Sequence, residues 1–197
     1  MQYALTDGIR RLAQPGTRAA CPTCSGPVLA KCGSINAWHW AHEAADCDPW
    51  SEPESAWHLN WKRQFPEAQT EVVIGPHRAD VVTPCHVIEL QHSPISPEEI
   101  REREEFYHAL IWVFDASGFR DNIEFRQKGT YYTFRWKHPR KSLWACQRPM
   151  FLDLGQEGLF RVEKLYPKVP CGGWGNPVDQ REFLRIAQRP RIQPVAQ

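Results

Sequence analysis

The sequence predicts an α/β fold in which a mixed β-sheet is flanked by helices. Between residues 51 and 115, a helical stretch is followed by three short apolar runs, a second helical stretch and another apolar run. Three short runs separated by turn residues are typical of antiparallel strands. A helix before the last run is typical of a crossover connection, which makes the sheet mixed.

The first helical stretch, Glu54–Phe65, begins after Pro53 and carries two stripes of side chains spaced four residues apart. The apolar stripe consists of Trp57, Trp61 and Phe65. The polar stripe consists of Glu54, His58 and Lys62. We expect the apolar stripe to pack on a sheet, and the polar stripe to lie at the edge of that contact, within reach of a site on the sheet.

The apolar runs and the second helix follow in order. The first three runs are separated by Gly75, Pro76 and Pro84. These runs are Glu71–Ile74, Arg78–Val82 and His86–Leu90. Ser96 is a suitable N-cap for the second helix, with Pro97 at its first position. Leu110–Phe114 is then predicted to be a buried strand.

Composition divides the chain into four predicted regions. They are a zinc-binding module at residues 1–50, the α/β core at 51–115, a β-rich extension packed on that core at 116–187, and a flexible tail at 188–197. Strands in the extension are expected at Thr130–Trp136, Met150–Leu154 and Leu159–Val162, and a short helix is expected at Val178–Ala187.

The overall composition is that of a globular protein with an aromatic core. The chain has 197 residues, of which 42% are hydrophobic and nine are Trp. The net charge of +1 gives no support to nucleic-acid binding by the whole protein, so any such site must be a local patch. The sequence has no signal-peptide pattern and no run of membrane-spanning length, so we expect a cytoplasmic protein without a membrane partner.

Two carboxylates on adjacent predicted strands indicate a metal site. Asp80 and Glu89 would form a hard-oxygen pocket for a divalent cation, and Gln91 could orient an attacking water. This combination favours metal-assisted phosphodiester hydrolysis. His58, on the preceding helix, could act as a general base or proton relay. Lys62 on the same helix, or Arg78 on its strand, could stabilise the phosphate.

Each of these residues also has a structural interpretation. Asp80 could be a strand-end carboxylate paired with Arg78 or Lys62, and Glu89 could be an exposed residue of an edge strand. Gln91 taken alone carries almost no information. Together with the polar stripe of the helix, the set favours an active site.

The same residues resemble a known family. The series Glu54-Ser55-x-x-His58, Arg78-Ala-Asp80-Val and Ile88-Glu89-x-Gln91 resembles the competence-protein CoiA-like family of the PD-(D/E)XK nuclease superfamily. The resemblance implies a restriction-endonuclease-like core that acts on DNA, with Mg²⁺ or Mn²⁺ bound at Glu54, Asp80 and Glu89. The usual lysine of the E-x-K motif is Gln91 here, as it is in the CoiA-like group, so Lys62 or His58 would have to supply the missing positive charge.

The pair Arg103 and Tyr107 lies one turn apart on the second helix. Spacing alone allows two interpretations, which are a buried Tyr with Arg stacked on it, or a support for the site or a contact to phosphate. The family resemblance favours the second interpretation.

Cysteine and histidine pairs near the N-terminus predict a structural zinc site. Cys21-x-x-Cys24 is followed, after fourteen intervening residues, by His39-x-x-His42, and these four residues are the preferred ligand set. Cys47 could replace one of the two His. A redox C-x-x-C is the alternative, but it would need a βαβ context that is absent here. The CoiA-like resemblance extends to this segment.

Basic and aromatic residues alternate between residues 131 and 141. These residues could form a stacking surface for single-stranded nucleic acid, or a strand with one face buried and the other basic. We favour the second interpretation for the aromatic side chains, and we leave open a phosphate contact by the cations, which are Arg135, Lys137, Arg140 and Lys141. The glycine-rich Cys171–Gly175 segment lacks phosphate-loop spacing and is expected to be a tight turn.

The sequence therefore predicts a Mg²⁺-dependent nuclease with a structural zinc site, acting in competence and recombination or in defence against foreign DNA. The first alternative is a catalytically inactive nuclease-like protein that binds nucleic acid or serves as an adaptor. A second alternative is a zinc module that binds another protein.

Overall fold

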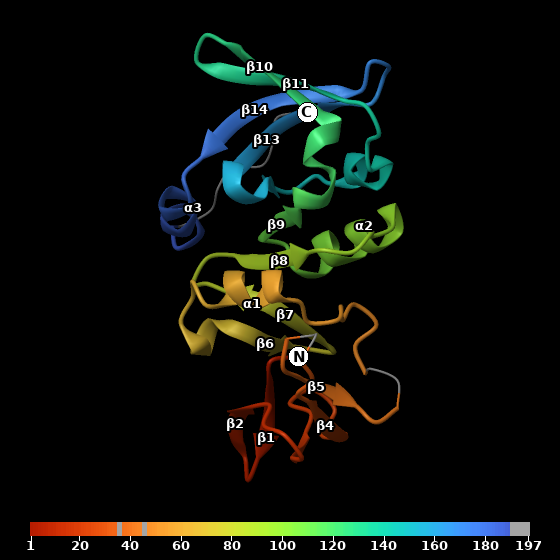
Figure 1. Cartoon of the computed structure of the whole chain (residues 1–197), viewed down its shortest axis with the longest axis vertical. Helices are drawn as coiled ribbons and strands as arrows, with labels where there is room; N and C mark the ends of the chain where they lie inside the picture. The colour runs from red at the N-terminus through yellow and green to blue at the C-terminus, as the bar shows by residue number, and fades with distance from the viewer. Residues whose placement is uncertain (35–36, 45–46, 190–197) are drawn as a thin grey trace. The chain divides into compact units, whose positions relative to one another are not determined.

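The structure is a computed structural model that describes residues 1–34, 37–44 and 47–189 (Figure 1). The chain divides into two compact units, Met1–Val82 (unit 1) and Thr83–Gln197 (unit 2). Most of the predicted flexible tail, from residue 190 onward, lies outside the described residues. In the described part of the chain, the helices are too short or too polar to span a membrane.

Unit 1 opens with a small antiparallel sheet with the strand order β2-β1-β3-β4-β5. Its strands are β1 (Tyr3–Thr6), β2 (Ile9–Leu12), β3 (Arg18–Ala20), β4 (Pro27–Lys31) and β5 (His39–His42). Trp40 is fully buried among small side chains such as Ala4, Cys21 and Val28. Its indole N–H donates to Arg11 O at 2.9 Å, so this small core is closed by one large aromatic side chain.

A short helix and a hairpin complete unit 1. They are α1 (Ala56–Lys62), the 3₁₀ turn η1 (Glu67–Gln69), β6 (Thr70–Ile74) and β7 (His77–Val82). Helix α1 begins later than predicted because Ser55 is the N-cap, with its hydroxyl accepting the His58 N–H. Of the predicted apolar stripe, Trp61 and Phe65 are buried, whereas Trp57 is half-buried. The polar stripe is buried as well, which differs from its expected place at the edge of a contact.

Unit 2 is built on a large mixed sheet with the order β10-β11-β14-β13-β12-β9-β8. Its strands are β8 (Val87–Gln91), β9 (Leu110–Asp115), β10 (Ile123–Lys128), β11 (Tyr131–Trp136), β12 (Met150–Asp153), β13 (Leu159–Tyr166) and β14 (Gly172–Val178). Its helices are α2 (Pro97–Phe106), α3 (Gln180–Ala187) and the 3₁₀ turns η2 (Ser117–Asn122), η3 (Lys141–Ala145) and η4 (Gly155–Glu157).

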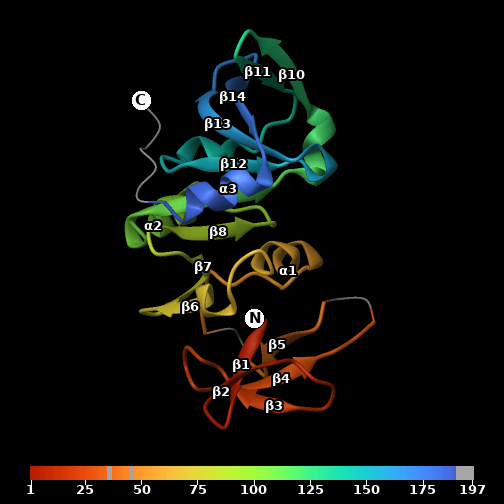
Figure 2. The same ribbon diagram turned by 90° about the vertical axis from the view of Figure 1, so that its left-hand side faces the viewer.

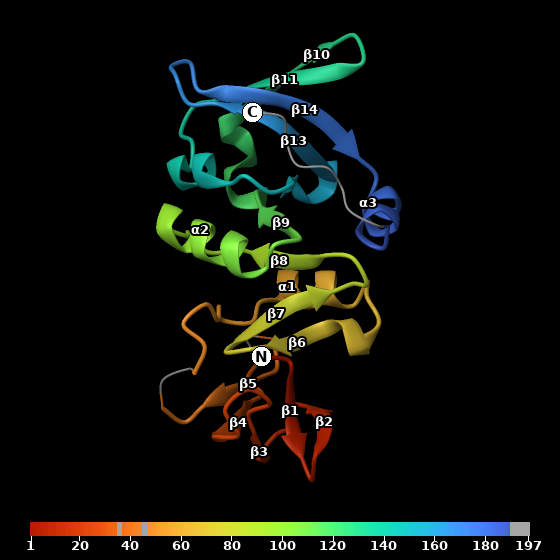
Figure 3. The ribbon, with the colours of Figure 1, turned by 180° about the vertical axis from the view of Figure 1, so that it is seen from behind.

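The helix α2 connects two parallel strands, as the crossover pattern predicted. Strands β8 and β9 are parallel, and β12 is parallel to β9, whereas the remaining pairs in unit 2 are antiparallel. Ser96 caps α2 by accepting the Glu99 N–H at 3.0 Å. Both β8 and β9 are buried along their whole length, which is typical of parallel strands covered on both faces. Figures 2 and 3 show α2 beside these strands.

The glycine-rich segment after Cys171 is a strand rather than the expected tight turn. It forms the start of β14, between β11 and β13 (Figure 3). A Cβ atom at Gly173 would lie 2.8 Å from the ring of Phe134, and one at Gly175 would lie 2.8 Å from the ring of Phe160. The same Cβ atoms would lie 2.1 Å from Lys164 O and 2.0 Å from Arg161 O, so glycine is required here because both the backbone of β13 and aromatic rings pack directly against this strand.

Candidate functional site

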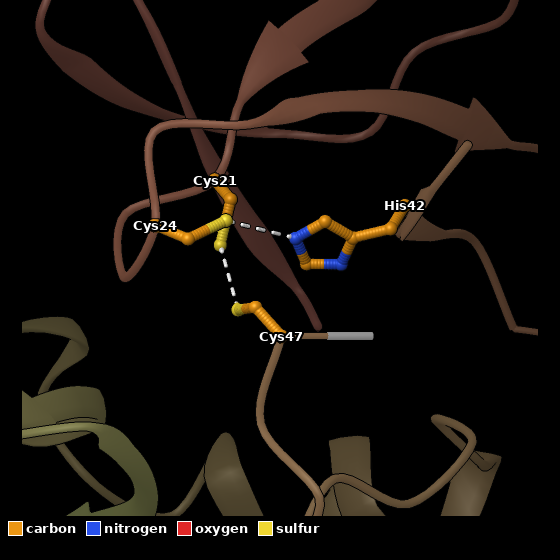
Figure 4. Close-up of side chains that lie close together, drawn as sticks. All are labelled: Cys21, Cys24, His42 and Cys47. Carbon is orange, nitrogen blue, oxygen red and sulfur yellow. Dashed lines mark hydrogen bonds between the residues drawn. The ribbon is translucent and has the colours of Figure 1, made fainter. Parts of the chain in front are cut away.

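Three thiols and one imidazole gather in unit 1 (Figure 4). Cys21 and Cys24 lie on the turn between β3 and β4, His42 ends β5, and Cys47 lies on the following loop. One ligand atom from each residue lies within 4.8 Å of all the others. The described residues therefore contain a Cys₃His group that could bind zinc.

The spacing of these atoms fits a tetrahedral zinc site. Cys21 Sγ lies 3.8 Å from Cys47 Sγ, and Cys24 Sγ lies 3.4 Å from His42 Nε2. Bonds of about 2.3 Å to sulfur and about 2.0 Å to nitrogen put tetrahedral ligand atoms roughly 3.5–3.8 Å apart. The N–H groups of Thr23 and Gly26 donate to the sulfurs of Cys21 and Cys24.

The thiols differ in acidity. A hydrogen bond from the Gly26 N–H, with a further contribution from His42, lowers the pKa of the Cys24 thiol to about 7. Burial, together with the neighbouring thiols, raises the pKa of Cys47 to about 12. Metal binding must displace the thiol protons, so the affinity of this group for zinc should depend on pH.

The ligand group differs from the preferred set in one residue, since Cys47 takes the place of His39. Successive side chains of a strand point to opposite faces, so His39 and His42, three residues apart on β5, face opposite ways. His39 Nδ1 instead donates to Ala37 O at 2.8 Å. The sequence had identified Cys47 as the alternative ligand.

A second cluster in unit 1 surrounds the ammonium group of Lys62, which is buried. Its Nζ atom lies 3.1 Å from both carboxylate oxygens of Glu54, 2.9 Å from Glu71 Oε1 and 3.2 Å from Asp80 Oδ1. The side chains of Glu54 and Glu71 are almost fully buried, whereas that of Asp80 is 21% exposed. The pairing of Asp80 with Lys62 agrees with the structural interpretation of Asp80, and leaves it as the carboxylate of this cluster nearest to solvent.

The charges of this cluster depend on one another. Burial alone would lower the pKa of Lys62, but the carboxylates of Glu71, Asp80 and Glu54 together raise it. Burial would raise the pKa of Glu71, but Lys62 is the main group that lowers it below its usual range. Burial raises the pKa of Glu54 despite the attraction of Lys62. Lys62 and Glu71 are thus held as charged groups, and Glu54 is the carboxyl that takes up a proton more readily.

Glu71, which no sequence pattern indicated, is also part of this cluster. Its carboxylate also accepts the backbone N–H groups of Gln2 at 2.7 Å and Tyr3 at 3.1 Å. Glu71 has a positive φ of 48°, which breaks the alternation of the strand and buries Glu71 as well as Thr70. A local backbone conformation of this kind leaves no signal in the sequence.

His58 and Arg78 have structural partners of their own. His58 Nδ1 lies 2.8 Å from Ser55 Oγ, and His58 Nε2 lies 3.4 Å from Glu52 Oε2. Burial would lower the pKa of His58, but the bond to Glu52 and the charge of Asp80 raise it. Arg78 donates from its backbone N–H to Asp48 at 2.8 Å, and from its guanidinium to Ser51 at 3.0 Å.

Glu89 and Gln91 lie in unit 2, on the same face of β8 because they are two residues apart. Glu89 is only 4% exposed, so the interpretation as an exposed edge residue is wrong. Its Oε2 atom accepts a hydrogen bond of 2.6 Å from Arg103, which also pairs with Glu99. The amide of Gln91 donates to Ser93 O at 3.0 Å. Arg103 therefore holds the carboxylate of Glu89 in place.

Tyr107 is buried at the C-terminus of α2, one turn after Arg103. The guanidinium of Arg103 lies 5.9 Å from the centre of the Trp112 ring, and the ring of Tyr107 contacts Phe106 edge-on.

The fold and the Cys₃His group define a class of mixed α/β proteins with a thiol-rich metal-binding segment before the main sheet. Residues 9–49 match the family model for the N-terminal domain of competence protein CoiA. The competence protein CoiA of Bacillus subtilis (strain 168) is 28% identical over 180 residues, which cover 77% of this chain and 47% of the relative. We conclude that the chain is related to the CoiA-like family, in agreement with the sequence resemblance.

The chain thus spans about half of the length of the curated relative that it matches. No solved structure matches it.

Proposed function

We propose that this chain is a metal-dependent nuclease that cleaves DNA, in competence and recombination or in defence against foreign DNA. The competence role is suggested by the name of the relative, competence protein CoiA. A restriction-endonuclease-like core is suggested by the order of elements from α1 to β9, which is helix, three strands, helix and strand.

The observation that carries the proposal is the convergence of carboxylates in unit 1. Glu54 lies in the segment just before α1 and Asp80 lies in β7, and their oxygens lie within 3.2 Å of one cationic atom, Lys62 Nζ. With Glu71 in the same cluster, three carboxylates surround one ammonium group. Carboxylate oxygens are the ligands that Mg²⁺ and Mn²⁺ prefer, so these donors suit a hard divalent cation.

A bound divalent cation would activate the attacking water and offset charge on the phosphate. In this proposal, Glu54 and Asp80 hold the ion, and Asp80 presents its carboxylate on the solvent side. Lys62 keeps the carboxylates of Glu54 and Asp80 close together. The resemblance assigns Glu89 and Gln91 to the nuclease motif as well, and within unit 2 the carboxylate of Glu89 is held by Arg103.

An inactive nuclease-like protein is the second candidate. Two observations favour it, since Lys62 already neutralises part of the carboxylate charge, and Gln91 replaces the lysine that is usual in the superfamily. Such a protein would bind DNA or a partner without cleaving it.

Replacing Asp80 by Asn should abolish cleavage of labelled DNA in Mg²⁺ or Mn²⁺. A catalytic metal contributes several kcal/mol to stabilising the transition state, so the rate should fall at least about 100-fold. Asp121→Asn, which changes an exposed carboxylate of the 3₁₀ turn η2, is the matched control and should keep the wild-type rate. Cleavage by Asp80→Asn at the wild-type rate would sink the assignment, and binding without cleavage by the wild type under any divalent ion would favour the inactive protein.

A further inference from the structure

We propose that the solvent-facing side of β10, β11, β14 and β13 in unit 2 binds single-stranded DNA. The choice of DNA rests on the proposed function, whereas the binding surface is argued from unit 2 alone and needs no cleavage. We call this surface the β-face.

Strand register places cationic side chains together on the β-face. Residues that pair directly across antiparallel strands project on the same side of a sheet. Between β10 and β11, Lys128 pairs with Tyr131 and Arg126 pairs with Thr133. Thr133 pairs with Trp174 of β14, and Trp174 pairs with Lys164 of β13. The exposed cations of the β-face are Arg126, Lys128, Arg135 and Lys164.

The same register separates two groups of aromatic side chains. Phe125, Phe134 and Phe160 lie on the opposite side of the sheet, where their rings pack together. Of the aromatic residues expected to be buried, Phe134 and Trp136 are buried, whereas Tyr131 is exposed. The aromatic residues of the β-face are Tyr131, Trp174 and Tyr166.

These three aromatic residues are accessible to a ligand. Tyr131 is 40% exposed, Tyr166 is 45% exposed, and Trp174 is half-buried. The rings of Tyr131 and Trp174 lie 5.6 Å apart in an edge-to-face arrangement. A single exposed aromatic residue is common on protein surfaces, but several beside a row of cations are the usual components of a surface that stacks bases and contacts phosphates.

The charge of the β-face is positive. Its acidic residue Glu124 is paired with Lys137 at 2.7 Å, and the neighbouring Glu163 is paired with Arg161 at 3.0 Å. Within the described part of unit 2, the four cations of the β-face form no ion pair with a carboxylate. The whole chain is nearly neutral, so the positive charge of the β-face is local. The net charge of the chain had indicated that any nucleic-acid site must be a local patch of this kind.

A cavity of about 390 Å³ adjoins this surface. Arg135 and Lys137 line it from β11 and the residue that follows, and the loop from Val169 to Cys171 lines the other side. At position 172 of β14, glycine lies between Arg135 and Tyr166 in the strand register. The cavity is within the size range of small-ligand sites; Glu124, which is paired with Lys137, also lines it, so Arg135 is the cation of its lining that could contact a phosphate.

The aromatic contacts favour a single strand over a duplex. Unpaired bases can stack on exposed rings, whereas the bases of a duplex are already stacked on one another. Four cations on a single strand should give a salt dependence of the dissociation constant with a slope of roughly 3 on logarithmic axes.

Fluorescence anisotropy with a labelled DNA oligonucleotide, in buffer without added divalent ions, tests the β-face. Without divalent ions no cleavage is expected, so the assay measures DNA binding by the β-face separately from the proposed nuclease activity. Trp174→Ala should weaken binding of the single strand about 10-fold or more, and the double variant Arg126→Glu, Lys164→Glu should also weaken it and lower the salt slope. Trp38→Ala, an exposed Trp of unit 1, and Arg181→Glu, an exposed cation of α3, are the matched controls.

The expected result is weaker binding by the β-face variants alone, with a duplex of the same sequence bound about 10-fold less tightly by the wild type. Near-ultraviolet circular dichroism of Trp174→Ala would show whether unit 2 keeps its fold. The proposal is overturned if folded β-face variants bind as tightly as the wild type, or if the duplex binds equally well.

Discussion

Replacing Lys62 by Met is expected to destabilise the chain by about 3–5 kcal/mol at pH 7, because it leaves buried carboxylates without their counter-charge. Lys62 Nζ contacts Glu54, Glu71 and Asp80, and the first two are almost fully buried. Methionine keeps much of the length of the lysine side chain, so the loss should come from charge rather than from an unfilled cavity.

The measurement is denaturant unfolding of the wild type and Lys62→Met between pH 4 and pH 8, with Arg63→Met as an exposed control one residue away. The control should change stability by no more than about 0.5 kcal/mol. In Lys62→Met the penalty should shrink as the pH falls, because protonated carboxyls no longer need a counter-charge. A penalty equal to that of the control, or independent of pH, would contradict this description of the cluster.

The wild type should show the corresponding dependence on pH. The pKa of Glu71 is lowered from 4.5, so its contribution to stability is present above that value and is lost as acid protonates the folded protein. The pKa of Lys62 is raised from 10.5, so its contribution is present below 10.5 and is lost only at higher pH.

Replacing Cys47 by Ser should reduce bound zinc from about one ion per chain to near zero. Structural zinc in small modules contributes an apparent binding energy of about 10–16 kcal/mol, so thermal stability of unit 1 should fall with it. The physical reason is that Cys47 Sγ, 3.8 Å from Cys21 Sγ, completes the Cys₃His group. Zinc content by atomic emission and unfolding of unit 1 by circular dichroism are the two measurements.

Two variants make this a test of the ligand set rather than of the segment. Cys32→Ser removes a thiol that is not in the group, and His39→Ala removes the histidine that the spacing favoured. Both should keep the zinc. Loss of zinc in His39→Ala with retention in Cys47→Ser would restore the predicted Cys₂His₂ set.

The order of elements could be predicted because it depends on local patterns. Ser96 and Pro97 define the start of α2, and the apolar run Leu110–Phe114 forms a strand buried on both faces. The helix near the end of the described chain was expected at Val178–Ala187 and spans Gln180–Ala187. The Gly173 and Gly175 segment was misread because its glycines serve ring packing within a strand, and this depends on Phe134 and Phe160 far away in the sequence.

The candidate sites could be predicted in part, for a similar reason. Cysteine spacing identified Cys21 and Cys24, but the choice between His39 and Cys47 depended on which way a strand presents its side chains. The polar stripe of the predicted helix, which begins before α1, placed Glu54 and Lys62 close together. It gave no indication of Glu71, whose side chain reaches them only because of its positive φ.

The central claim is that the carboxylates near Lys62 hold a catalytic divalent cation, and electron paramagnetic resonance titration with Mn²⁺ tests it most directly. With the Cys₃His group already loaded with zinc, the wild type should bind one Mn²⁺ per chain. Asp80→Asn should bind it at least about 10-fold more weakly, since even groups that only support a metal ligand alter affinity by about 10–100-fold. Equal binding by the two proteins, or no bound Mn²⁺ in the zinc-loaded wild type, would contradict the claim.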